Sequence, residues 1–339
     1  EMQRSLVGSE MCIRDSPYSN WKNTNFETPG YGKELVSRTY DENKWERALT
    51  ACNEALDWAL TQGNRKLFDL ATSTSIRINQ GVPLPNIEGV DDQFKESVML
   101  MRYLNTTRET DGNKEVIFAI GSGDNYGIYS QIPHGVTTYN GSPVGGWGGI
   151  AVFLNSVERF YTKNGKLPQY DHTFPDKSDW FESAGLSNPD IIKLNVNREP
   201  RFYVNICFNG AYWIGDQKTR IQLYYTGGSG KKGTWDFPRS GYIAIKNVSP
   251  SSNPKNGNYI KRPFVIMRYA EILLNYVEAL NEYDPSNADI TLYLNMIRKR
   301  AGVPDIEEVY PDAAGDQTRM RELIRRERQV ELCFENLRY

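Results

Sequence analysis

The sequence has few of the residues on which enzyme active sites commonly depend. Its 339 residues include two histidines, His134 and His172, and these lack a metal-ligand spacing such as H-E-x-x-H. No G-x-S-x-G nucleophile elbow is present. The 42 acidic residues leave a glycosidase pair open, because such a pair is defined by a separation across a cleft that a sequence does not show. We predict a protein that is not an enzyme and that uses no metal and no cofactor.

Cysteine pairs, a strong net charge and long apolar runs are also absent. The four cysteines are scattered without a C-x-x-C pair, which argues against a zinc site or a disulfide framework. We expect Cys52, Cys207 and Cys333 to serve as small hydrophobic residues. The net charge of −2 offers no basic face, so no nucleic acid partner is expected. No run approaches the roughly 18–20 apolar residues of a membrane helix.

The C-terminal stretch 262–339 contains three helical patterns in succession. Apolar residues recur at helical spacing over 268–280, 286–301 and 320–337. The first two patterns and their turn occupy about 34 residues, which is the period of a tetratricopeptide-type hairpin. This stretch therefore predicts packed helical pairs.

One carboxylate in the third pattern is out of place. Glu327 falls on its apolar stripe, and a carboxylate that faces a core is strongly unfavourable unless it forms an ion pair with a cation. We predict a partly buried Arg–Glu network that ties the three helices together. Its expected members are Arg268, Glu271, Arg298, Arg300 and Glu327. The alternative is that Glu327 lies at the edge of the stripe and reaches water.

The remainder of the chain mixes helices with short strands. Helical spacing predicts helices over 43–60, 93–104 and 150–163, and an apolar run predicts a buried strand over 115–120. Residues 171–258 are irregular and aromatic, with short strands predicted at 202–214, 221–225 and 242–245. Because loops on a rigid scaffold commonly carry recognition, we expect the binding loops in this middle region.

Four ordered blocks near the C-terminus resemble the closing signature of the SusD/RagB family. They are Arg-Tyr-Ala-Glu-Ile-Leu-Leu at 268–274, Glu-Ala-Leu at 278–280, Asn-Met-Ile-Arg-Lys-Arg-Ala-Gly-Val-Pro at 295–304 and Glu-Arg-Gln-Val-Glu-Leu-Cys-Phe-Glu-Asn-Leu-Arg-Tyr at 327–339. Because the blocks keep both order and spacing, the resemblance is more specific than any one short motif.

The resemblance implies a mostly α fold. Tetratricopeptide-like helical hairpins would form a SusD-like α–α superhelix with an irregular, partly β central insertion. We expect helical scaffold at 17–120, a loop-rich ligand-binding insertion at 121–261 and a C-terminal helical scaffold at 262–339. Residues 1–16 join poorly to the residues after them and are interpreted as a non-native leader. The rest is interpreted as an internal fragment of one longer SusD-like domain.

The resemblance also implies a function. Family members are surface-exposed lipoproteins of Bacteroidetes that bind glycans and sit on a SusC-type TonB-dependent transporter. We expect a protein of polysaccharide utilisation that binds a glycan, or another oligomeric nutrient, at the cell surface and delivers it to such a transporter. It would reach the outer membrane through a lipid anchor outside this fragment. The alternatives are a helical-repeat interaction protein without a small-ligand site, and a glycoside hydrolase.

Aromatic side chains of the middle region are the candidate binding residues, because sugar rings stack on tryptophan and tyrosine. The expected stacking residues are Trp147, Trp213 and Trp235, with Tyr139, Trp180 and Tyr212 behind them. The alternative for each is an ordinary aromatic of a core or a hairpin.

Overall fold

The computed structural model describes residues 42–69, 82–122, 125–134, 138–139, 142–143, 146–214, 218–232, 235–254 and 257–335. The expected leader at 1–16 lies outside these residues. The helices are α2 (Glu42–Thr61), α4 (Asp92–Thr106), α5 (Asn125–Tyr129), α6 (Leu154–Glu158), α7 (Pro200–Asn205), α8 (Tyr269–Tyr283), α9 (Asp289–Arg300), α10 (Ile306–Val309) and α11 (Gln317–Glu331). The strands are β1 (Val116–Ser122), β2 (Thr138–Tyr139), β3 (Ser142–Pro143), β4 (Ile206–Phe208), β5 (Tyr242–Ala244) and β6 (Pro263–Arg268).

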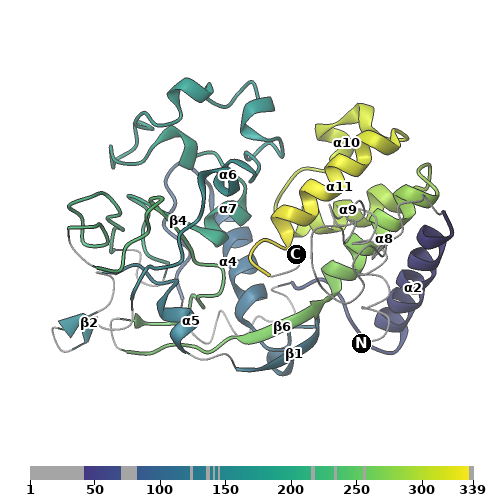
Figure 1. Cartoon of the computed structure of the whole chain (residues 1–339), viewed down its shortest axis with the longest axis horizontal. Coiled ribbons are helices and arrows are strands. Elements are labelled where there is room, and N and C mark those ends of the chain that lie inside the picture. Colours follow the sequence, from purple (N-terminus) through teal and green to yellow (C-terminus); the bar gives the residue numbers. More distant parts are fainter. Residues whose placement is uncertain are drawn as a thin grey trace, which may run out of the picture.

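A layer of long helices forms one side of the molecule. Helix α8 packs against α2, α9 and α11, and Figure 1 shows these helices grouped together. Their facing sides bury one hydrophobic core, which contains Cys52 of α2 and Tyr276 of α8. The mostly α fold with small β elements, predicted from helical spacing and from the resemblance, is confirmed. No helix of the described residues has the length and apolar character needed to cross a bilayer.

The hairpin of α8 and α9 ends where the sequence places a glycine. Gly302 follows α9 with φ of +70°, a left-handed conformation that favours glycine. A Cβ atom at this position would also lie 2.9 Å from Oγ of Ser97, which belongs to α4. Gly302 therefore ends the helix and lets α4 approach the hairpin closely.

A second core lies around α4 and α7, on the other side of the molecule. It contains Tyr103 and Leu104 of α4 and Phe202 of α7. Antiparallel pairs join β1 to β6, β2 to β3 and β4 to β5. In Figure 1 the β1–β6 ribbon runs beneath both sides of the molecule.

Strand β1 is present, but the prediction that it is buried was wrong. Phe118 and Ile120 are 47% and 60% exposed. Within the described ranges the strand pairs with β6 alone, in a two-stranded ribbon, which leaves these two side chains exposed.

The helix predicted over 150–163 is much shorter than its apolar pattern suggested. Only α6 forms, and Phe153 before it is 82% exposed. The buried guanidinium of Arg198 donates from Nη2 to the backbone oxygens of Val157 and Phe160, both at 2.7 Å. Because these carbonyls accept hydrogen bonds from a side chain that is distant in sequence, the helical pattern does not continue and the helix ends.

Of the strand predicted over 202–214, only β4 at Ile206–Phe208 forms, so the prediction was wrong at both ends. Residues Pro200–Asn205 form α7, and extended structure begins only at Ile206. Proline suits the first turn of a helix because its fixed φ is already helical and its missing N–H is not needed there. Arg201 and Asn205 are buried through polar contacts, so apolar periodicity does not mark this helix.

Two other boundaries also differ from the predictions. No strand forms over 221–225, because the chain turns there with the N–H of Gly227 bonded to the oxygen of Tyr224. Helix α11 ends at Glu331, and Phe334 follows it with φ of +61°. Leu337, expected on the same helix, lies outside the described residues. Strand β5 lies within the predicted range 242–245.

Buried Arg–Glu pairs connect the two cores. Glu327 is fully buried on α11 and accepts hydrogen bonds from Nη1 of Arg298 at 2.9 Å and from Nη1 of Arg201 at 2.6 Å. Arg298 belongs to α9 beside the first core, whereas Arg201 belongs to α7 beside the second. Glu327 therefore joins α11 to α7, and the paired residues Glu327 and Arg201 lie 126 positions apart in the sequence.

The same network extends one turn further along α11. Glu331 accepts from Arg201 at 3.1 Å and from Arg268 at 2.8 Å, and it also pairs with Arg300. Glu115, before β1, accepts from Arg268 at 2.6 Å. The cations of the network are Arg201, Lys246, Arg268, Arg298 and Arg300, and its carboxylates are Glu115, Glu199, Glu327, Glu331 and Glu335.

Among the residues that the structure describes, five cations thus face five carboxylates, so their charges are balanced. Arg268, Arg298, Arg300 and Glu327 are four of the five residues expected in the network. Glu271 is buried on α8, and the ion pairs given above involve the other four.

The arginines change how the buried carboxylates titrate. Burial opposes ionisation of Glu327, but the positive charges of Arg201 and Arg298 outweigh it and hold the pKa of that carboxyl below its ordinary value of 4.5. The pKa of Glu331 is lowered in the same way, with burial opposed by Arg300 and Arg268. Glu199 differs, because burial outweighs the charge of Arg201 and raises its pKa.

Removing one carboxylate from this network should strongly destabilise the fold. We expect Glu327→Gln to lower the free energy of unfolding by about 3–5 kcal/mol, since Arg201 and Arg298 would lose their shared partner in a dry environment. The matched control is Glu322→Gln on the same helix, where an exposed pair with Arg319 should be worth less than about 1 kcal/mol. Urea denaturation measures both, and equal effects would contradict a stabilising network.

The stability should also depend on pH through these carboxylates. Glu327 and Glu331 have folded-state pKa values below their ordinary 4.5, so their contribution is present above about pH 4.5 and is lost as the pH falls through the folded values. The raised pKa of Glu199 acts in the opposite direction and offsets part of this loss. We expect the urea midpoint to fall between about pH 5 and about pH 3, and to fall less steeply in Glu331→Gln. A variant as acid-sensitive as the wild type would refute this assignment.

Candidate functional site

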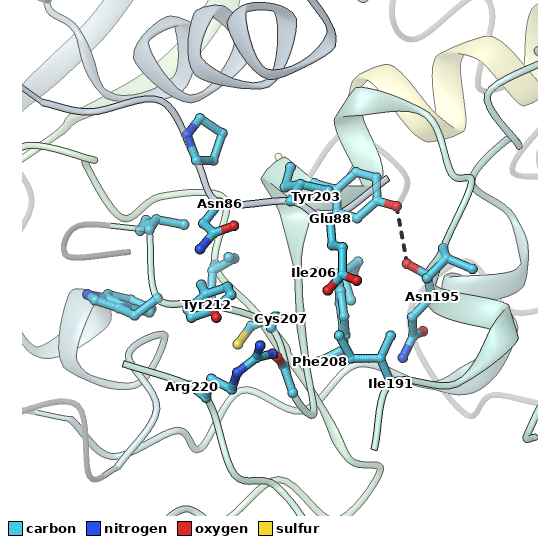
Figure 2. A pocket seen from close by; sticks show the side chains of 18 of the residues that line it. Asn86, Glu88, Ile191, Asn195, Tyr203, Ile206, Cys207, Phe208, Tyr212 and Arg220 are labelled. Atoms are coloured by element: carbon cyan, nitrogen blue, oxygen red, sulfur yellow. Dashed lines mark hydrogen bonds between the residues drawn. The ribbon is translucent and has the colours of Figure 1, made fainter. Parts of the chain in front are cut away.

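A cavity opens beside α4, α7 and β4, on the side of the molecule away from α2, α8, α9 and α11. Its space amounts to about 730 Å³, open solvent included. Residues 85–88, strand β4, the segment 210–214 and Arg220 line it, and Figure 2 shows their side chains around it. Its lining is mostly apolar with a few polar side chains such as Asn86, Glu88 and Arg220, which is the usual character of a ligand site.

The wall of the cavity is fixed by the packing of α4 against α7. Asp91 caps α4, and its side chain accepts from the backbone N–H of Phe94 at 2.8 Å. The ring of Phe94 meets that of Tyr203 edge to face, with 5.6 Å between centroids. Tyr203 donates its hydroxyl to the backbone oxygen of Asn195 at 3.2 Å, as the dashed line in Figure 2 shows. Burial raises the pKa of Tyr203 to about 12, so it remains a neutral donor.

The rim combines an aromatic ring with charges of both signs. The guanidinium of Arg220 lies over the ring of Tyr212, 4.2 Å from its centroid, and donates to the backbone oxygen of Gly210 at 3.1 Å. Glu88 accepts from the backbone N–H and the hydroxyl of Ser187 at 2.9 and 2.6 Å. These hydrogen bonds lower the pKa of Glu88, which is therefore ionised at neutral pH.

The interior of the cavity is lined by two buried donors. Arg102 of α4 is 3% exposed and donates from Nη2 to the backbone oxygen of Tyr203 at 2.5 Å, while its Nε and Nη1 have no partner within the described residues. Trp213 is also 3% exposed, and its Nε1 likewise has no partner there. Burial lowers the pKa of Arg102 to about 9, which leaves it charged at neutral pH.

The predicted aromatic residues do not form one platform. Tyr212 and Trp213 line the cavity together. Trp180 is buried in the second core, where its Nε1 donates to the backbone oxygen of Pro175 at 2.8 Å. A ligand has no access to a ring packed in this way.

The other three candidates lie away from the cavity lining or outside the described side chains. Trp147 is half-buried and meets the ring of Tyr129 edge to face at 5.5 Å. Trp235 is 98% exposed in the loop before β5. Tyr139 belongs to β2, and its side chain is outside what the structure describes.

The sequence analysis missed the charged residues of the cavity. Arg102 carried a usable signal, because it stands in the apolar run of α4 between Met101 and Tyr103. This is the pattern that marked Glu327, a charge on a buried helix face. Glu88 and Arg220 lie in irregular segments, where no periodic pattern marks them.

Comparisons with known proteins all point to one family. A sequence model of the SusD family matches residues 95–339. A solved protein named BT4246 is 36% identical with a TM-score of 0.82, and the match covers 99% of this chain and 57% of that chain. A SusD-like protein of Bacteroides fragilis NCTC 9343 is 22% identical with a TM-score of 0.56, covering 94% of this chain and 55% of that chain, which supports the fold.

A curated relative gives the same indication over a shorter stretch. The SusD-like protein P2 of Formosa agariphila is 35% identical over 86 residues, which are 25% of this chain and 17% of that protein. The present chain thus spans less than two thirds of the length of the solved and curated relatives described here.

Truncating one buried and one exposed tryptophan should have very different effects on stability. Trp180→Ala removes a fully buried ring, and we expect it to lower the free energy of unfolding by about 3–5 kcal/mol. Trp235→Ala truncates a ring in solvent, so we expect a change within about 0.5 kcal/mol. Urea denaturation followed by circular dichroism measures both. A strongly destabilising Trp235→Ala would mean that this ring is packed in solution.

Proposed function

The chain belongs to the SusD family, and we propose that it binds glycans at the cell surface and passes them to a SusC-type TonB-dependent transporter. The observation that carries the proposal is the family match over residues 95–339, which includes the cavity-lining residues from Arg102 to Ile245 but not residues 85–88. The 36% identity to BT4246 over nearly the full chain supports it.

The geometry of the cavity suits a sugar. Binding a pyranose takes an aromatic face and a few fixed polar groups. Tyr212 supplies the ring at the rim, Asn86 and Glu88 supply an amide and a carboxylate from one segment, and Arg220 supplies a guanidinium from another (Figure 2). These groups surround a space that is already open.

A binding role without catalysis agrees with the family, whose members are non-catalytic binding proteins. Glycoside hydrolysis commonly uses two carboxyl groups across a cleft. Among the cavity-lining residues within the described ranges, Glu88 is the sole carboxylate. The cavity therefore favours capture of a glycan over its cleavage.

Delivery needs a second surface that remains free while the ligand is bound. Figure 1 places α2, α8, α9 and α11 on one side of the molecule and β4, next to the cavity, on the other. We propose that the helical side docks on the transporter at the outer membrane, to which a lipid anchor would attach the protein. Co-purification with a co-expressed SusC-type barrel tests this docking.

A helical-repeat interaction protein is the competing function. The burial of Trp180 and Trp213 is what that hypothesis expects. The open cavity with Tyr212 on its rim and the fully exposed ring of Trp235 favour ligand binding instead.

Affinity electrophoresis and isothermal titration calorimetry with a panel of polysaccharides test the proposal. We expect at least one polysaccharide to bind, and we expect Tyr212→Ala to weaken it about tenfold, a loss of about 1.4 kcal/mol from the stacking face. The control is Tyr170→Ala, which truncates an exposed tyrosine that does not line the cavity. Failure of every glycan to bind, with clear binding of a peptide or glycopeptide, would refute the glycan role. Equal effects of the two variants would indicate that the glycan binds outside the cavity.

A further inference from the structure

The two interior donors of the cavity have a feature in common. Both Arg102 and Trp213 carry N–H groups and no acceptor, and both are only 3% exposed. Nε and Nη1 of Arg102 and Nε1 of Trp213 have no hydrogen-bond partner within the described residues. A buried donor without an acceptor is unfavourable, so these groups need an acceptor from elsewhere.

Arg102 lacks a partner at two nitrogens, whereas Arg201, Arg298 and Arg300 each lack one at a single nitrogen within the described residues. Arg201, Arg268 and Arg298 pair with carboxylates of the Arg–Glu network. Arg198 carries no carboxylate partner within the described residues, but it donates to the backbone oxygens of Tyr161, Leu194, Val157 and Phe160. Within the described residues, the guanidinium of Arg102 has one hydrogen-bond acceptor, the backbone oxygen of Tyr203.

The neighbouring groups do not supply the missing negative charge. Cys207 lines the same cavity, but burial raises the pKa of its thiol to about 12 and keeps it neutral. Glu88 stands at the exposed rim and is held by Ser187. Arg220 adds a second guanidinium to the lining. The two guanidiniums against one carboxylate leave the cavity with a positive balance.

We propose that this cavity takes a carbohydrate with an anionic substituent, a carboxylate or a sulfate, which pairs with Arg102 and accepts from Nε1 of Trp213. The carbohydrate part of the inference rests on the proposed function, whereas the anion site stands on the two buried donors. A guanidinium binds carboxylate and sulfate oxygens through charge-assisted, often bidentate, hydrogen bonds. The neutral rim contacts of Tyr212 and Asn86 would then hold the uncharged part of the sugar.

Matched charged and neutral oligosaccharides provide the test. The probes are an oligogalacturonate with its methyl ester, and a sulfated oligosaccharide with its desulfated form. We expect at least one acidic member to bind the wild-type protein tenfold or more tightly than its neutral counterpart. The pair that shows the difference identifies carboxylate or sulfate as the substituent.

Variants assign the preference to the two donors. Arg102→Met keeps an unbranched side chain and removes the guanidinium with its charge, and we expect it to abolish the acidic preference. Trp213→Phe keeps an aromatic ring and removes the N–H, and we expect a several-fold loss. Arg108→Met, at an exposed arginine outside the cavity, is the control and should change nothing. Melting temperatures report folding, and we expect that of Arg102→Met not to fall, because a buried charge without a carboxylate partner is removed.

A direct measurement separates the anion site from the glycan role. The indole ¹H–¹⁵N resonance of Trp213, assigned through Trp213→Phe, should shift saturably with sodium sulfate or sodium galacturonate and should not shift in Arg102→Met. Glycan binding without acidic preference or indole shift overturns the anion site and leaves the proposed function intact. An indole shift without binding of any oligosaccharide overturns the glycan role and leaves the anion site intact. Absence of both the shift and the preference overturns the inference.

Discussion

The buried Arg–Glu network is the interaction on which the rest of this structure depends. Two carboxylates of α11, Glu327 and Glu331, both accept from Arg201 of α7, so one short helix of the central region is fixed to the C-terminal helices. Moving so many charges out of water is unfavourable, and it is offset only when each group meets an opposite charge at hydrogen-bond distance. The network therefore tolerates one arrangement of the segments that contribute to it. Because α7 leads directly into β4, that arrangement also sets the position of the cavity wall.

Buried arginines have two different roles in this molecule. In the network, each guanidinium has a carboxylate partner supplied by the chain itself, and the result is a fixed junction between two hydrophobic cores. In the cavity, Arg102 keeps two nitrogens without a partner among the described residues. The first arrangement stabilises the fold. The second lowers the stability of the empty protein and reserves donors for a ligand, which is the compromise expected where a stable scaffold carries a binding site.

The sequence predicted the parts of this fold that local spacing determines. Long amphipathic helices such as α2, α8 and α11 were identifiable because their apolar residues recur with the helical period. Helix α7 was missed because its buried faces are held by polar partners, and the helix after 150 was overestimated because Arg198 takes its carbonyls from about 40 positions away. The Arg–Glu network shows the same division. Glu327 was noticed as a charge on an apolar stripe, but its partner Arg201 could not be found, because no local pattern reveals which residues meet across 126 positions.

Helix α7 contributes to both the Arg–Glu network and the cavity wall, and this has a consequence for recognition. Arg201 faces the network, and Tyr203, two residues later, faces the cavity. A displacement of this wall would separate several buried ion pairs, so the wall is preorganised before any ligand arrives. Association should then lose little conformational entropy in the backbone of α7 and β4. Adjustment to different ligands would be confined to the irregular segments around residues 86 and 212, while the frame behind them stays still.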